Sequence, residues 1–363
     1  MKKWLRGAQL TLPMILLILL TSCGVPGVIA QGKSLPAAQP TATATALPPI
    51  HLPWDEAPHR DLTEWWYFTG HFSGKDAAGV TRSYGFELTF FQVLRGFVPP
   101  TYIGHFAITD INKKQFHYLQ QLQIEPNASI PNGTSADGFH LKIGDWFMNG
   151  VNGKDTLGAS MSGYTLQVSL ASVKPPALHN GGLLTYGAAG FSYYYSYTRL
   201  ILSGTIIDNG AAIPITGLAW MDHQWGNFIG VGGIGWNWFS VQLSNNTEYM
   251  IYVIRNASGS PVSLFSTAIN AQGVSSTIPE AAIKEQILGT WKSPQTGITY
   301  PSGWKLQLGG IVITISPILA NQELITTQTT GNIYWEGDCQ VSAEIHGATI
   351  PGYGYTELTG YGA

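Results

Sequence analysis

Residues 164–170 read YTLQVSL, and this stretch decides the fold class of the chain. Its even-numbered positions, from Tyr164 to Leu170, are all apolar, and a polar residue stands between each pair. A period of two is typical of an antiparallel strand with one buried face. FELTF at 86–90 and WKLQL at 304–308 repeat the pattern. We therefore predict an all-β protein built from antiparallel strands.

Turn-forming runs separate these alternating stretches, and no window of a dozen residues has the spacing of an amphipathic helix. The runs are FSGKDAAG (72–79), EPNASIPNG (125–133), IDNG (207–210), LSNN (243–246) and NASGS (256–260). A chain with this many short strands closes them into barrels or sandwiches, because closure removes unpaired edges.

Two similar Trp-rich stretches indicate that the chain consists of two related halves. EWWYFTGHF at 64–72 and GWNWFSVQL at 235–243 are both Trp-rich strands followed by a turn and a second apolar strand. We predict a first antiparallel barrel over residues 51–228 and a second over 229–363. Each has the size of an ordinary domain.

The composition excludes several classes of protein. The chain has 363 residues, a net charge of −3 and only 11% charged residues, so it lacks the basic surface of a nucleic-acid partner. None of its nine histidines has the tight spacing of a metal ligand pair, and no metal or other cofactor is predicted. GVGGIG at 230–235 precedes a strand rather than a helix, so it is interpreted as a turn and not a dinucleotide site.

The N-terminal segment is typical of an exported lipoprotein. A positive start and an apolar run that ends at Leu20 form a signal peptide over residues 1–22. The following LTSC resembles a bacterial lipobox and predicts lipidation of Cys23; a plain secretory signal is the alternative. Residues 23–50 form a Pro/Ala/Thr-rich linker. These features predict a cell-envelope protein, anchored by lipid to the outer face of the bacterial membrane. Cys339 is expected to be buried.

The best candidate for chemistry is GLAWMDHQWG at 217–226. On a strand, Asp222 faces one side while His223 and Trp225 face the other, and a strand end or bulge could bring all three to one cavity. A carboxyl beside aromatic walls holds a proton near neutral pH, and an indole stabilises a cation. That combination suits acid-catalysed addition of water to an alkene. The alternative is a structural corner in which Asp222 bonds turn amides.

Other polar positions have two interpretations each. Glu64 is either a second carboxylate in an aromatic pocket or the exposed end of a strand. His105 either lines a cavity or is a structural histidine. In SYYYSYTRL at 192–200, Tyr193, Tyr195 and Tyr197 share one face and Tyr194 takes the other, where they fill a core or line an apolar cavity.

Seven stretches in one order resemble a known family. They are EWWYFTGHF, GHFAITD, KPPALHNGG, YYYSYTRLILSG, GLAWMDHQWG, GWNWFSVQL and a terminal YWEGDC…GYGYTELTGY. From about residue 51 onward they are similar to the carotenoid 1,2-hydratase (hydroxyneurosporene synthase) and AttH-like group. The resemblance implies two tandem lipocalin-like barrels that hold a hydrophobic ligand. It also implies that His223 and Trp225, preceded by Asp222, act in hydration of a terminal alkene.

Two hypotheses follow for function. The first is a hydratase acting on an isoprenoid or another lipid, and the second is a protein that binds or presents a hydrophobic molecule without catalysis. The residues expected to contact the ligand in either case are Glu64, Trp66, Tyr67, His105, Tyr195, Trp220, Trp236 and Trp238. A carboxyl with a perturbed pKa in a closed cavity would favour the first hypothesis. A wide, purely apolar barrel mouth would favour the second.

Overall fold

A computed structural model describes residues 47–95, 98–124, 137–186, 190–227, 235–256 and 258–362. From Pro48 onward the chain forms one compact unit, which contains all the strands named below. The predicted signal peptide and Cys23 lie outside the described residues. In the described ranges we find no helix that has both the length and the apolar character needed to cross a membrane.

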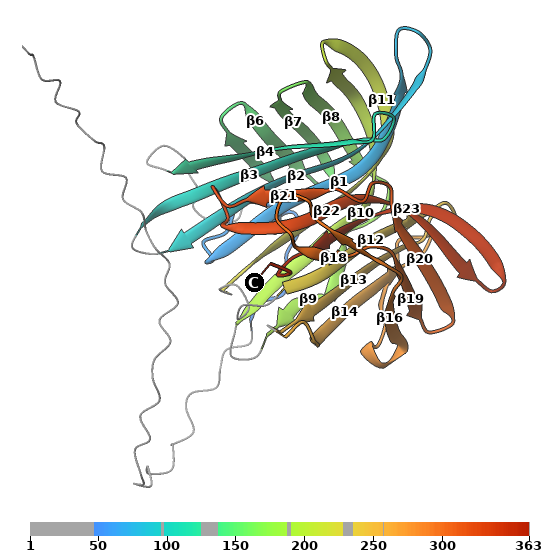
Figure 1. Ribbon diagram of the computed structural model, residues 1–363. Helices are drawn as coiled ribbons and strands as arrows, with labels where there is room; N and C mark the ends of the chain where they lie inside the picture. The colour runs from blue at the N-terminus through green and yellow to red at the C-terminus, as the bar shows by residue number, and fades with distance from the viewer. Residues whose placement is uncertain are drawn as a thin grey trace, which may run out of the picture. The chain divides into compact units, whose positions relative to one another are not determined.

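The first sheet contains eleven strands of the described chain, drawn from blue through green to yellow-green in Figure 1. Its hydrogen-bonded order is β4-β3-β2-β1-β11-β10-β8-β7-β6-β5, with β9 beside β10. Its strands are β1 (Thr63–Lys75), β2 (Thr81–Arg95), β3 (Val98–Asp110), β4 (Gln115–Ile124), β5 (Phe139–Ile143), β6 (Trp146–Val151), β7 (Lys154–Met161), β8 (Tyr164–Ser172), β9 (Ala177–Thr185), β10 (Phe191–Asp208) and β11 (Ala211–Gly226).

The second sheet contains ten strands of the described chain, in the order β15-β14-β13-β12-β23-β22-β20-β19-β16, with β21 beside β22. Its strands are β12 (Gly235–Leu243), β13 (Glu248–Arg255), β14 (Pro261–Ile269), β15 (Ser275–Thr277), β16 (Ile283–Ile287), β19 (Trp304–Leu308), β20 (Ile311–Pro317), β21 (Glu323–Thr326), β22 (Asn332–Ile345) and β23 (Ala348–Leu358). A small ribbon pairs β17 (Thr290–Lys292) with β18 (Thr299–Pro301).

The predicted all-β class is confirmed. All strand pairs of the described residues are antiparallel, and the two short 3-10 helices are η1 (Trp54–Glu56) and η4 (Glu280–Ala282). In the first sheet the end strands β4 and β5 come into contact, so the sheet curls into a nearly closed barrel. The second sheet curls around its own apolar core, as the two-barrel prediction requires.

Three apolar cores explain where each strand face is buried. One lies inside the first barrel and one inside the second. A third lies between the sheets and includes Tyr67, Tyr194, Trp220 and Trp238. The even positions of YTLQVSL are buried as predicted.

On β2, however, the face opposite the barrel core is not half-exposed as the alternation suggested. Glu87 and Thr89 are buried there. They lie in a pocket to which the second sheet also contributes residues, so that sheet covers this face.

Local sequence fixes the hairpin that brings β11 back along β10. Asn209 and Gly210 both have positive φ, 49° and 89°, as a two-residue hairpin turn with matching twist requires. The predicted IDNG turn is therefore confirmed. The EPNASIPNG turn lies outside the described residues.

A bulge in β10 joins the two sheets. The register shifts between Tyr197 and Leu200, and Arg199 there reaches Glu248 on β13 with an Nε–Oε1 distance of 2.5 Å. Lys174 reaches the same carboxylate through Nζ at 2.5 Å. All three side chains are at most 7% exposed, so they form an internal ion triad between the barrels.

The predicted domain boundary at 228/229 lies outside the described residues. β11 of the first sheet ends at Gly226, and β12 of the second begins at Gly235. Cys339 is fully buried with a free thiol, as expected for a small apolar side chain.

Candidate active site

The functional side chains of strand β11 lie on its two opposite faces. Trp220, Asp222 and Gln224 face the second sheet, while His223 and Trp225 face the interior of the first barrel. The predicted alternation is therefore confirmed, but the expectation that Asp222, His223 and Trp225 share one cavity is wrong. No bulge interrupts the pairing of β1 with β11 along this stretch, so the alternation is kept.

The strand registers place two rows of side chains opposite one another. In the first sheet, Thr89, Tyr67, Asp222 and Ser196 are successive cross-strand partners. In the second sheet, Tyr252, Trp238, Glu357 and Glu336 are successive partners in the same way.

Hydrogen bonds join the two sheets across the gap between these rows. The Tyr67 hydroxyl donates to Glu336 Oε1 at 2.7 Å, and Trp238 Nε1 donates to the Tyr194 hydroxyl at 2.9 Å. Each bond runs from one sheet to the other. The two sheets thus form one site, here called the intersheet pocket.

The intersheet pocket has aromatic walls and acidic polar groups. Its lining residues are Trp65, Tyr67, Glu87, Thr89, Phe91, Tyr194, Asp222, Gln224, Trp236, Trp238, Tyr252, Tyr334, Glu336 and Glu357. No lysine, arginine or histidine is among these described lining residues. A water-sized molecule can enter about 60 Å³ of it, which is room for a few waters. Three of the lining side chains, Trp65, Phe91 and Trp236, are half-buried, so the pocket has partly exposed aromatic residues.

Burial keeps protons on these acids. Glu336 is fully buried, and burial together with the charges of Glu357 and Glu87 raises its pKa well above the usual range. Burial also raises the pKa of Glu87, although Thr89 donates a hydrogen bond to it. Oε2 of Glu87 and Oε2 of Glu336 have no hydrogen-bond partner in the described part of the chain. Glu336 and Glu357 are direct cross-strand partners, an arrangement that disfavours two negative charges.

Asp222 is the most heavily hydrogen-bonded acid of the pocket. It accepts from Trp220 Nε1 at 2.6 Å, from the Tyr194 hydroxyl at 2.7 Å and from the Ser196 hydroxyl. Burial raises its pKa to about 7 against these donors, and burial raises the pKa of Glu357 to about 7 as well. The pocket therefore holds acids with different proton affinities, which is the arrangement that acid–base chemistry requires.

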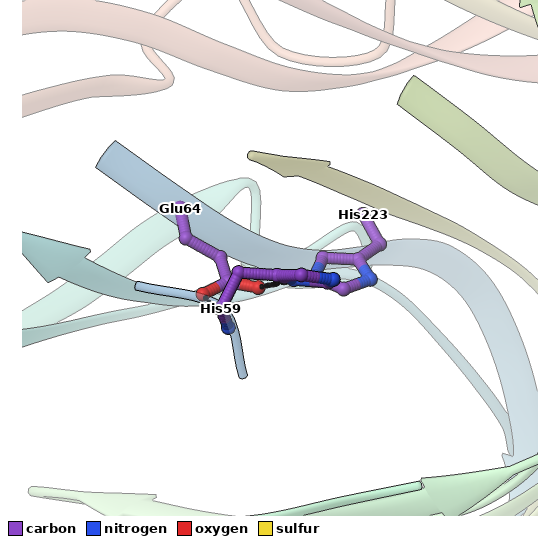
Figure 2. Close-up of side chains that lie close together, drawn as sticks. All are labelled: His59, Glu64 and His223. Carbon is purple, nitrogen blue, oxygen red and sulfur yellow. Dashed lines mark hydrogen bonds and ion pairs between the residues drawn. The ribbon is translucent and has the colours of Figure 1, made fainter. Parts of the chain in front are cut away.

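A second polar cluster lies in the interior of the first barrel, here called the imidazole cluster: His59, Glu64 and His223. Figure 2 shows the Glu64 carboxylate next to both rings. Its Oε1 lies 2.8 Å from His59 Nδ1 and 2.8 Å from His223 Nε2. Burial lowers the pKa of His59, but the adjacent carboxylates of Asp55 and Glu64 stabilise the protonated ring and raise the pKa to about 9. Burial lowers the pKa of His223 to about 4.

The residues predicted to contact a ligand divide between the two sites. Tyr67, Trp236 and Trp238 line the intersheet pocket. Trp220 and His105 stand behind it, through hydrogen bonds to Asp222 and Tyr334 respectively. The residues that belong instead to the barrel interior are Glu64, Trp66, Tyr195, His223 and Trp225.

Sequence reasoning missed three acids of the pocket, Glu87, Glu336 and Glu357. Each stands in an alternating or aromatic stretch, FELTF, YWEGD and YTELTGY, of a chain with only 11% charged residues. A carboxyl group within a predicted strand is unusual in a chain with so few charges, and this could have marked the three acids as candidates. The strand sequence does not show, however, which of its faces a second sheet covers.

The buried groups predict an unusual dependence of stability on pH. Burial raises the pKa of Asp155 to about 8, and those of Asp222 and Glu357 are about 7. Unfolded carboxyls ionise near about pH 4, so between about pH 4 and pH 8 the folded state holds more protons and these acids lower stability as pH rises. Burial lowers the pKa of His105 and His179 to about 3, so these residues lower stability as pH falls below about 6.5.

Above about pH 6.5 the histidines no longer oppose the acids, so we expect the free energy of unfolding to fall from about pH 6.5 toward about pH 8. Urea denaturation across this range measures it. Asp155→Asn, which removes one buried acid outside the pocket, should reduce the slope. Stability that rises through this interval would contradict the assignment of protonated buried acids.

Comparisons with known proteins place the chain in a family. Residues 43–361 match the family described as AttH-like. The crystal structure of an AttH protein from Nitrosomonas europaea is 28% identical, with a TM-score of 0.77, and the match covers 88% of this chain and 99% of that one. Kievitone hydratase from Nectria haematococca is 17% identical, with a TM-score of 0.67 and coverages of 86% and 94%, and therefore shares the fold. None of the curated proteins matches the chain. The chain belongs to the AttH-like family.

Proposed function

We propose that this protein adds water to an isolated carbon–carbon double bond of an apolar substrate in the intersheet pocket. The observation that carries the proposal is a set of acids with raised pKa values between aromatic walls. The described residues that line the pocket include no lysine, arginine or histidine. The kievitone hydratase fold supports it, since one protein of this architecture is named as a hydratase. Fold alone does not assign function, so the acids carry the argument.

The chemistry divides between two acids of different pKa. Glu336, with the higher pKa and a free Oε2, gives its proton to one alkene carbon as the general acid. The cation that forms on the neighbouring carbon faces the rings of Trp65, Trp236 and Trp238, whose electron-rich faces stabilise it. Asp222 or Glu357, each with a pKa of about 7, takes a proton from the water that attacks the cation.

The size of the pocket favours a particular kind of substrate. With about 60 Å³ open, it admits the end of a chain more readily than a whole polycyclic molecule. A branched terminal alkene gives the tertiary cation that the aromatic walls can stabilise. We therefore propose that the substrate is an acyclic isoprenoid or another lipid, for example a carotenoid.

The test is turnover in water labelled with oxygen-18. The purified protein is incubated with acyclic isoprenoids and unsaturated fatty acids, and products are analysed by mass spectrometry. The proposal expects one labelled hydroxyl per molecule of product. Asp155→Asn is the matched control, because Asp155 is a buried acid that does not line the pocket. Binding of these lipids with no turnover of any of them would instead establish a non-catalytic binding protein.

We also propose that Cys23 carries the lipid that anchors the protein at the outer face of the bacterial membrane, where the ligand is met. The support is the lipobox-like LTSC and the linker that follows it. Intact-mass analysis of the mature protein should show an acylated Cys23 at the N-terminus, and Cys23→Ala should release the protein from membranes. A mature chain that begins elsewhere would contradict the anchor.

A further inference from the structure

The imidazole cluster brings three metal-ligand atoms to one point. Glu64 is on β1, His223 is its near neighbour on β11, and His59 lies in the segment before β1. Their ligand atoms all lie within 4.8 Å of one another, and both imidazole nitrogens are 2.8 Å from the same carboxylate oxygen. Within the described residues, it is the one group of histidine, cysteine and acidic side chains whose ligand atoms lie this close together.

Further contacts hold each of the three ligands in place. Asp55 Oδ1 lies 3.5 Å from His59 Nε2, and the Tyr195 hydroxyl lies 3.2 Å from His223 Nδ1. The other carboxylate oxygen of Glu64 accepts from the His59 backbone N–H at 2.8 Å and from Gln92 Nε2 at 3.0 Å. Partners of this kind fix the orientation of metal ligands and raise their basicity.

Two indoles fix the ring planes. His59 stacks on Trp225 with 4.2 Å between ring centroids and 3° between planes, and His223 stacks on Trp66 at 4.7 Å and 21°. Glu64 and His223 are 0% exposed at the side chain and His59 is 13% exposed. The ligand atoms are therefore preorganised and shielded from competing water.

We propose that His59 Nδ1, His223 Nε2 and Glu64 Oε1 bind one divalent transition-metal ion, with zinc best matched to this donor set. Zinc bonds of 2.0–2.1 Å in a tetrahedron separate ligand atoms by roughly 3.3 Å, so the two nitrogen–oxygen distances of 2.8 Å have to open by about half an ångström. When the ion binds, the ring proton of His59 that faces Glu64 leaves to solvent, and His223 carries its single ring proton on Nδ1, toward the Tyr195 hydroxyl. The carboxylates of Glu64 and Asp55 then balance its charge of two.

The metal ties the segment before β1 to β1 and β11. It lies on the opposite face of β11 from the intersheet pocket, so the inference stands independently of the proposed hydration. Because three protein groups supply the ligands, one position of a four-coordinate ion is left for water.

The test uses the full chain after removal of metals with a chelator. Titration with Zn²⁺ alone, followed by calorimetry, should show about one ion bound per chain and a higher thermal midpoint. Co²⁺ in its place should give the intense visible absorption of a four- or five-coordinate ion. Failure of the chelated, folded protein to bind either ion, or a weak six-coordinate Co²⁺ spectrum, would overturn the proposal without any variant.

Variants then assign the ligands. Glu64→Gln and His223→Gln should lose affinity for Zn²⁺ at least about a hundredfold, and Asp55→Asn should lose roughly 10–100-fold through the His59 ring. His140→Gln, an exposed histidine outside the cluster, is the matched control and should bind as the wild type does. Equal affinity in all four variants would place the ion elsewhere and overturn the assignment. The Co²⁺ spectrum of the wild type keeps the test valid if a variant fails to fold.

Discussion

Glu336→Gln is expected to lower the turnover of an alkene substrate by roughly 10²–10⁴ while leaving its binding nearly unchanged. The amide has the shape of the acid but cannot give up a proton to carbon. Oε1 of the side chain still accepts the hydrogen bond that the Tyr67 hydroxyl donates, so the two sheets stay joined. Initial rates and the fluorescence of a bound lipid, measured on the same preparation, separate catalysis from binding.

The control for this experiment is a buried acid of similar environment that does not face the substrate. Asp155 is 3% exposed, and burial raises its pKa to about 8, but it lies outside the pocket. Asp155→Asn should therefore keep wild-type turnover. If both variants lose activity together, or if Glu336→Gln keeps its rate, Glu336 is not the general acid.

Glu248→Ala is expected to have the largest effect on stability, a loss of about 3–5 kcal/mol. Glu248 is fully buried and pairs with both Lys174 and Arg199, so its removal leaves two cations without a counter-ion between the barrels. The pair of Arg82 with Asp76, whose side chains are 34% and 16% exposed, is the matched comparison, and Asp76→Ala should lower stability far less than Glu248→Ala does. Urea denaturation of each variant gives the free energies.

A triple variant distinguishes charge from packing at the same place. Lys174→Met with Arg199→Met and Glu248→Leu removes all three charges and keeps apolar volume. It should be more stable than Glu248→Ala, because no unpaired charge is left buried. If the three changes instead add up to a greater loss, the triad contributes through its hydrogen bonds to backbone carbonyls such as those of Leu243 and Asn270.

Much of the fold follows from local sequence. The period of two in YTLQVSL and WKLQL, the turn at Asn209–Gly210 and the opposite faces of Tyr193 and Tyr194 are all found in the structure. Each depends only on residues close together in the chain. The correspondence of the two Trp-rich stretches is also found, because Trp65 on β1 and Trp236 on β12 approach one pocket from the two sheets.

The site was harder to predict because alternation separates two faces without identifying what covers them. Glu87 looks like a solvent-facing residue between Phe86 and Leu88, yet the second sheet buries it. The imidazole cluster was also not predicted, because its members are distant in the sequence. Glu64 and His223 are 159 residues apart and meet only through the register of β1 with β11. A search for tightly spaced histidines cannot find such a group.

The central claim is that the intersheet pocket holds protonated carboxyl groups near neutral pH. Infrared spectroscopy measures this directly, through the carbonyl band of a neutral carboxylic acid. At about pH 7 the wild type should show this band, Glu336→Gln should lose part of it, and it should weaken as the pH rises past about 8, where acids of raised pKa ionise. A spectrum with no neutral carboxyl at about pH 7, or one that Glu336→Gln leaves unchanged, would contradict the claim.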